Sequence, residues 1–91
     1  MHLLVGLGNP GSQFAGNRHN AGFLVVDEIH ERHRFGSYHE RFGGWCSMGV
    51  IEDERILLLK PTTFMNESGR SVDEVARFYK VPTEKILVLH D

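Results

Sequence analysis

The amino-acid sequence predicts a single α/β domain over residues 1–91, in which helices flank a mixed β-sheet. Two observations lead to this prediction. Short apolar runs of strand length alternate with longer segments whose apolar residues recur at the helical spacing. Glycine, proline and asparagine separate these segments, and the resulting order is β-α-β-β-α-β. Strands that alternate with helices in this way favour an α/β layer arrangement.

The first strand is expected at His2–Leu7, an apolar run that is closed by glycine. Gly8–Arg18 is rich in glycine, asparagine and other turn residues, so we expect a loop there. A helix is expected next, because Asn20 can cap it and apolar side chains fall on the successive turns that follow. Basic side chains near its C-terminal end interact favourably with the helix dipole, and Gly36 ends it.

The middle of the chain predicts a β-hairpin. Gly44–Ile51 and Arg55–Leu59 are strand-like, and the polar turn Glu52–Glu54 joins them. The second of these strands is apolar on both faces, which is typical of a central strand. Lys60–Pro61 ends this strand, because proline has no amide hydrogen to donate to the ladder.

A second helix is expected to begin at Asn66 or Ser68 and to end at Lys80. Its apolar positions recur at the helical spacing, and they are Val72, Val75, Ala76 and Tyr79. Val81–Pro82 prevents the helix from continuing. Lys85–Leu89 is a further apolar run, which predicts the last strand.

The composition is that of an ordinary globular protein, with 41% hydrophobic and 24% charged residues and a net charge of −2. The net charge therefore does not indicate a nucleic-acid-binding protein. Basic side chains do gather in one stretch, which could contact phosphate or form a solvated helix end and loop. They are His30, Arg32, His33, Arg34, His39 and Arg41.

The sequence predicts a cytoplasmic protein that does not enter a membrane. No apolar run approaches the length of a membrane span, and the N-terminus lacks the basic start and long apolar stretch of a signal peptide. The single cysteine, Cys46, excludes an internal disulfide and suits the reducing cytoplasm. We interpret Cys46 as a small hydrophobic side chain, because no adjacent residue offers a base that would activate it.

Polar residues follow three of the expected strands. Gly8–Asn9 comes after the first strand, Lys60–Asn66 after the third, and His90–Asp91 ends the fourth. Ligands of open α/β sheets bind outside the carboxyl ends of the strands. The sequence therefore predicts one site at this edge of the sheet.

His19 is the candidate general base of this site. An unperturbed histidine titrates near neutrality, which suits proton abstraction. Asp91 can end a strand at the same edge, and a carboxylate bonded to the ring would fix its tautomer and favour its charged form. No serine or cysteine is an obvious partner, so we expect a water nucleophile. The alternative is an ordinary surface histidine in a loop.

Asn9 and Asn66 are the candidate amides of the site. An amide side chain donates and accepts hydrogen bonds and does not ionise. Such groups hold a peptide backbone or donate to a developing oxyanion. The alternatives are a turn at Asn9 and a helix cap at Asn66.

The pattern Gly6-x-Gly8-x-x-Gly11 matches the fingerprint of a module that binds NAD or ATP. That motif needs a helix that starts at the third glycine, and no helical apolar period follows Gly11 directly. We therefore prefer the interpretation that the glycines let the backbone turn and approach a ligand closely. A plain strand-to-loop turn is the alternative.

Three histidines raise the question of a metal site. His30-x-x-His33 has a spacing that can bind zinc, and His39 follows downstream. The pattern lacks the carboxylate or thiolate ligands that usually accompany such histidines. A solvated helix end is the preferred interpretation, and no metal is predicted.

Four segments together resemble the bacterial-type peptidyl-tRNA hydrolases. They are Val5–Gly11 (VGLGNPG), Arg18–Phe23 (RHNAGF), Lys60–Val72 (KPTTFMNESGRSV) and Val88–Asp91 (VLHD). Each is weak alone, but their order and separations make the resemblance specific. The resemblance implies a monomeric α/β protein with a twisted mixed β-sheet and without a metal or nucleotide cofactor.

The resemblance also implies an activity and roles for the candidate residues. The reaction is hydrolysis of the ester between a peptide and the terminal ribose of tRNA, which recycles tRNA from aborted translation. His19 would activate the water, and Asp91 would orient His19 and support its protonated form. Asn9 and Asn66 would bind the peptide end of the substrate, and Asn66 could also stabilise the oxyanion.

Two apolar side chains complete the implied site. Met65 would offer an apolar wall. Phe14 stands where the family commonly has a tyrosine that stacks near the terminal adenosine, so the ring is kept and the hydroxyl is lost. Asn17 stands where the family often has threonine, and we expect little consequence.

Members of this family are about twice as long as this chain, closer to a typical domain. The resemblance therefore implies that residues 1–91 correspond to the N-terminal half of the domain. The other half would carry further strands, another active-site asparagine and most of the basic surface for tRNA. A non-catalytic fragment that binds the tRNA end is the alternative function.

Overall fold

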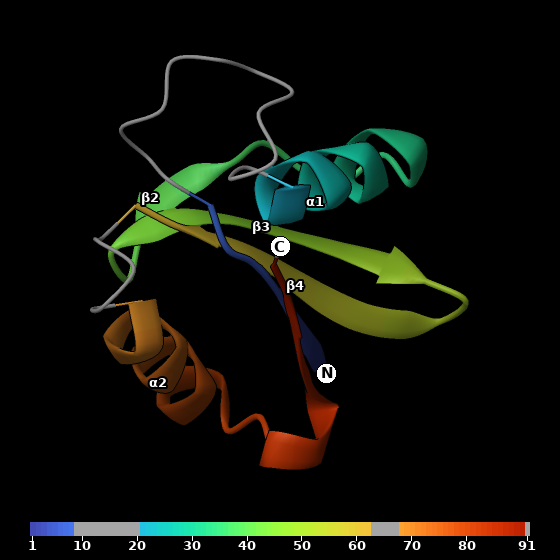
Figure 1. Ribbon diagram of the computed structural model, residues 1–91. Helices are drawn as coiled ribbons and strands as arrows, with labels where there is room; N and C mark the ends of the chain where they lie inside the picture. Colours follow the sequence, from blue (N-terminus) through green and yellow to red (C-terminus); the bar gives the residue numbers. More distant parts are fainter. Residues whose placement is uncertain (9–20, 63–67, 91) are drawn as a thin grey trace.

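The computed structural model describes residues 1–8, 21–62 and 68–90 (Figure 1). Within this part of the chain the elements are β1 His2–Gly6, α1 Ala21–Arg32, β2 His39–Arg41, β3 Gly44–Ile51, β4 Glu54–Pro61, α2 Ser68–Tyr79, the 3-10 helix η3 Thr83–Lys85 and β5 Ile86–Leu89. No helix in these described ranges is long and apolar enough to cross a membrane.

The strands form one sheet in the order β2-β3-β4-β1-β5. β1 runs parallel to β4 and to β5, whereas the β3–β4 and β2–β3 pairs are antiparallel. The predicted mixed sheet is therefore confirmed. Val5 pairs with Leu59, and Gly6 pairs with Leu89. The carboxyl ends of β1, β4 and β5 consequently meet at one edge of the sheet.

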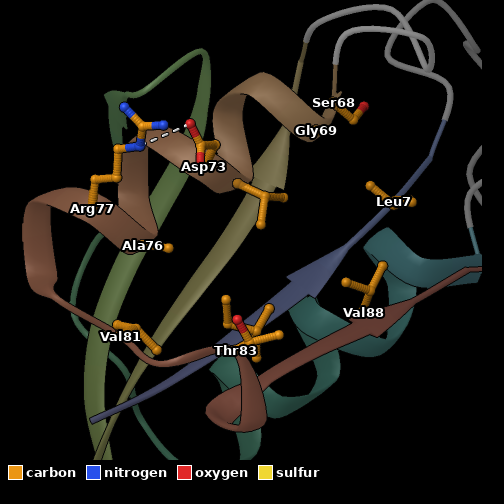
Figure 2. Close-up of a pocket in the computed structure, with 11 residues that line it drawn as sticks. Leu7, Ser68, Gly69, Asp73, Ala76, Arg77, Val81, Thr83 and Val88 are labelled. Carbon is orange, nitrogen blue, oxygen red and sulfur yellow. Dashed lines mark ion pairs between the residues drawn. The ribbon is translucent and has the colours of Figure 1, made fainter.

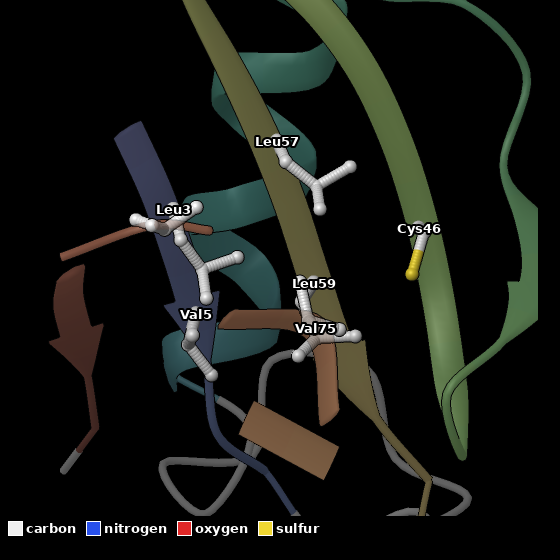
Figure 3. Packing of buried hydrophobic residues seen from close by; sticks show 7 residues of the cluster. Leu3, Val5, Cys46, Leu57, Leu59 and Val75 are labelled. Atoms are coloured by element: carbon white, nitrogen blue, oxygen red, sulfur yellow. The ribbon is translucent and has the colours of Figure 1, made fainter. Parts of the chain in front are cut away.

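The two α-helices cover opposite faces of the sheet (Figure 1). Successive side chains of β4 alternate between these faces. Leu57 and Leu59 pack in one cluster with Val75 of α2 (Figure 3), and Leu58 packs with Val26 of α1. β4 is thus buried on both faces, as its continuous apolar sequence predicts.

Residues with left-handed backbone follow both helices. α1 ends at Arg32, and Arg34 has a φ of 54°. α2 ends at Tyr79, and Lys80 has a φ of 56°. A single residue in this conformation commonly ends a helix, and it needs no glycine. The expected ends at Gly36 and Lys80 were therefore too late.

β2 was not expected from the sequence. Its residues, His39–Arg41, are all exposed and show no apolar alternation, so no strand pattern is visible. Antiparallel pairing with β3 defines this strand, with Arg41 opposite Gly44. Phe42 and Gly43 form the tight turn between the two strands, with φ values of 55° and 67°.

The hairpin between β3 and β4 is tighter than expected. Glu52 and Asp53 alone form its turn, with φ values of 50° and 67°. Glu54 already belongs to β4, where it pairs with Ile51. Two positive φ values in succession give the turn the twist that matches the flanking strands. At the other end of β4, Pro61 still pairs with β3, so the strand is longer than the expected range.

Candidate active site

Three described segments leave the sheet at its carboxyl edge. Leu7 and Gly8 follow β1, Thr62 follows β4, and His90 follows β5. The backbone amide of Leu7 donates to the carbonyl oxygen of Leu89 at 2.8 Å. β1 and β5 therefore stay paired up to the edge from which these segments start.

α1 begins at the same edge, because its first turn packs on the strand ends. A Cβ atom at Gly22 would lie 2.3 Å from the carbonyl oxygen of Leu7 and 2.4 Å from that of Leu89. No side chain fits at such distances, so glycine is required for this close approach. The start of α1 is thereby held against the ends of β1 and β5.

Gly6 and Gly8 allow the same close packing from the side of the strand. A Cβ atom at Gly6 would lie 2.3 Å from the carbonyl oxygen of Gly22, and one at Gly8 would lie 2.8 Å from the ring of Phe23. These contacts give the two glycines a role in packing, whereas their expected approach to a ligand stays a prediction. Their backbone approaches α1, while Gly11 lies outside the described residues.

The candidate site residues all lie outside the described residues; they are His19, Asp91, Asn66, Asn9, Phe14 and Met65. Their nearest described neighbours do come together. Gly8 directly precedes Asn9, and His90 directly precedes Asp91. Gly22 follows His19 by three positions, and it packs against Leu7 and Leu89, the residues that precede these two neighbours.

A cleft of about 600 Å³ lies between α2 and β5 (Figure 2). Leu7, Ser68 and Val88 line it together, so the start of α2 lies near the ends of β1 and β5. Ser68 follows Asn66 by two positions. Most of the lining is aliphatic, and an ion pair between Arg77 and Asp73, 3.1 Å from Nε to Oδ2, lies in its wall. The cleft thus offers apolar surface next to the carboxyl edge.

A polar network that the sequence did not predict lies on the α1 face of the sheet. Lys60 Nζ is 2.6 Å from Asp27 Oδ1, and the Tyr38 hydroxyl donates to the same oxygen at 2.7 Å. Burial raises the pKa of Tyr38, and its hydrogen bond to the Asp27 carboxylate raises it further. The phenol therefore stays a donor at ordinary pH. The only signals in the sequence were a carboxylate on the apolar face of a helix and a lysine that ends an apolar strand.

The histidines considered for zinc have other surroundings. His30 Nε2 lies 2.8 Å from the carbonyl oxygen of Gly36, and its ring stacks on Tyr38 with the ring centroids 4.3 Å apart. Within the described part of the chain, no group of three or more His, Cys, Asp or Glu side chains is placed to hold a metal ion. These residues thus provide no support for a zinc site.

Cys46 is part of the hydrophobic core, with 6% of its surface exposed (Figure 3). Burial raises the pKa of its thiol to about 11, and the charge of Arg41 opposes this only in part. The thiol is therefore protonated at neutral pH. The interpretation of Cys46 as a small hydrophobic side chain is confirmed.

Comparison with known proteins identifies the family. The model of the protein family described as peptidyl-tRNA hydrolase matches residues 3–91. The chain belongs to the peptidyl-tRNA hydrolase family. It is 57% identical over 91 residues to the peptidyl-tRNA hydrolases of Afipia carboxidovorans and Methylobacterium radiotolerans. These matches cover 100% of the chain and 45% of each relative, so the chain spans about half the length of its relatives.

Solved structures agree with this assignment. The crystal structure of peptidyl-tRNA hydrolase from Acinetobacter baumannii is similar to the chain with a TM-score of 0.91 and 42% sequence identity. The similarity covers 100% of this chain and 47% of that one. The α/β fold and the family resemblance that the sequence predicted are both confirmed.

Proposed function

We propose that the chain carries part of the active site of a peptidyl-tRNA hydrolase, as the N-terminal half of that domain. The substrate is the ester that joins a peptide, or an N-blocked amino acid, to the terminal ribose of tRNA. The protein acts as a monomer in the cytoplasm, and hydrolysis returns free tRNA to translation. Family membership supports the reaction class, and the fold supports the location of the site.

One observation carries the proposal. The close packing of Gly22 on Leu7 and Leu89 holds the start of α1 at the edge where β1 and β5 end. His19 precedes that helix, Asn9 follows β1 and Asp91 follows β5. The described segments next to these three residues therefore lie close together, which supports a general base and its partners at this edge.

In the proposed reaction His19 takes a proton from water, and the resulting hydroxide attacks the ester carbonyl carbon. Asp91 accepts a hydrogen bond from the other ring nitrogen and supports the imidazolium that forms. The amide of Asn66 donates to the oxyanion of the tetrahedral intermediate. Collapse breaks the bond to the ribose oxygen, which takes the proton back from His19 and leaves as a hydroxyl.

The remaining candidates bind the substrate in this proposal. Asn9 and Asn66 hold the peptide end through hydrogen bonds of their amides. Met65 provides an apolar wall. The ring of Phe14 stacks near the terminal adenosine, since an aromatic face suits stacking on any base.

A binding fragment without turnover is the second candidate function. It is favoured by one observation, that the chain covers 45% of the relatives it matches. In that case the tRNA end binds, but the rest of the catalytic site is absent. Binding would then survive the change His19→Ala, and the wild-type chain would hydrolyse nothing.

The test measures release of deacylated tRNA from an N-blocked aminoacyl-tRNA by this chain. His19→Ala should lower turnover by about 10²–10⁴, the usual contribution of a general base. His33→Ala is the matched control, because His33 is an exposed histidine that follows α1. Equal rates for wild type and His19→Ala would refute the role of His19. No hydrolysis by the folded wild-type chain would favour the binding fragment.

A further inference from the structure

The network of Asp27, Tyr38 and Lys60 joins three separate parts of the chain on the α1 face of the sheet. Lys60 Nζ also lies 4.3 Å from the ring centroid of Tyr38 and 5.9 Å from that of Phe23. One carboxylate and two aromatic rings therefore surround the ammonium group. The Lys60 side chain is 16% exposed. This cation is thus largely shielded from water and held from several sides.

Three other ion pairs within the described residues differ from this one. Their side chains are between 46% and 81% exposed; the pairs are His2–Glu54, Arg32–Glu28 and Arg77–Asp73. Two of them each join neighbouring turns within one helix, Arg32–Glu28 in α1 and Arg77–Asp73 in α2. Exposed pairs of this kind contribute little to stability. The Lys60–Asp27 pair, in contrast, connects a helix to a strand with one largely buried partner.

Beyond the close packing of Gly22 on Leu7 and Leu89, α1 buries little of its own surface. Its buried residues are Gly22 and Val26, whereas Leu24 and Val25 are 42% and 44% exposed. Apolar contacts have no preferred direction, so by themselves they define the rotation and register of a helix only loosely. A short charge-assisted hydrogen bond has a defined direction and length. The bond from Lys60 therefore selects one position of α1 over β4.

We propose that Asp27, Tyr38 and Lys60 are positioning residues, which fix α1 relative to β4 and thereby set the spacing between His19 and Asn66. This inference rests on the proposed function. His19 lies eight positions before Asp27, and Asn66 lies six positions after Lys60. The ion pair thus connects α1, which follows His19 in the chain, to β4, which precedes Asn66. None of the three positioning residues needs to touch the substrate.

The test uses nuclear Overhauser effects in the isotopically labelled chain, between the ring protons of His19 and the side-chain amide of Asn66. Lys60→Met removes the charge and keeps the aliphatic stem. Arg32→Met is the matched control, because it also replaces a cation by methionine, but in an exposed ion pair within α1. Backbone amide signals of β1 and β4 report whether each variant remains folded.

We expect wild type and Arg32→Met to show the contact, and Lys60→Met to lose it while the strand signals are unchanged. A merely stabilising ion pair would lower the unfolding temperature and leave the contact intact, which would overturn the inference. A wild-type chain without the contact would instead contradict the proposed function. If Lys60→Met does not fold, Asp27→Asn is judged by the same criterion, since it removes the charge and keeps the side-chain size.

Discussion

Gly22 in α1 lies directly against Leu89, the last residue of β5. A Cβ atom on Gly22 would lie 2.4 Å from the Leu89 carbonyl oxygen, so the backbones of two distant segments are in contact. The helix that follows His19 is thereby held beside the strand that leads to Asp91. The lack of a side chain at Gly22 is what allows α1 to approach the end of β5 so closely.

Gly22→Ala should therefore lower the free energy of unfolding. The added methyl group overlaps backbone atoms, which cannot move aside as a flexible side chain would, so we expect a loss of about 1–3 kcal/mol. Urea denaturation measures it. Gly69→Ala is the control, because nothing lies within 4 Å of a Cβ there and alanine favours the helix. A Gly22→Ala chain as stable as wild type would contradict the close packing.

Asn66→Ala should lower kcat by about 10²–10³ if its amide donates to the oxyanion. The loss should fall mainly on kcat, because the charge on the carbonyl oxygen develops only in the transition state. Steady-state kinetics with an N-blocked aminoacyl-tRNA separate kcat from KM. Asn17→Thr is the control, and it should change neither constant. A rise in KM alone would assign Asn66 to binding and not to catalysis.

Asp91→Asn should shift the pH profile of hydrolysis to lower pH. The carboxylate favours the imidazolium form of His19, so its removal lowers the pKa of that ring. The unprotonated base then becomes available at a lower pH, although the maximum rate falls because the ring is less well oriented. The measurement is kcat/KM against pH for both chains. A profile with an unchanged inflection would show that the two residues are not partners.

Stability should fall in alkaline solution because of Cys46. Its pKa is raised from 9.0 to about 11 by burial, so above pH 9 the unfolded thiol ionises while the folded one stays neutral. The unfolded state then binds fewer protons, and the free energy of unfolding decreases as the pH rises through this range. The unfolding temperature, measured between pH 8 and about pH 11, reports this loss of stability. The decrease should be smaller in Cys46→Ala, and equal slopes would exclude Cys46 as its cause.

The local patterns of the sequence predicted most of the fold. Apolar runs and helical spacing located β1, β3, β4, β5 and both helices, because these elements bury one or two faces against the core. β2 was missed, since its residues are exposed and pairing with β3 alone defines it. The helix ends were placed too late, because a left-handed Arg34 or Lys80 has no distinctive sequence signal.

The contacts near the candidate site could not be predicted in the same way. The packing of Gly22 on Leu89 and the bond of Lys60 to Asp27 join residues that are far apart in sequence. Such contacts leave no local periodicity, and a glycine or a lysine has many alternative roles. The prediction of a site at the carboxyl edge rests on strand order, which the sequence did indicate. The catalytic roles of His19, Asn66 and Asp91 stay predictions.

The central place of β1 has a consequence for the order of folding. β1 is the first strand to be synthesised, but its hydrogen-bonding partners are Glu54–Pro61 and Ile86–Leu89. The β3–β4 hairpin closes through a local turn, so it can form while β1 still lacks a neighbour. We expect β1 to dock onto the free edge of β4. The last strand to join should then be β5. Pulsed hydrogen exchange during refolding should therefore protect β3 amides before those of β1, and simultaneous protection would show that the sheet forms in one step.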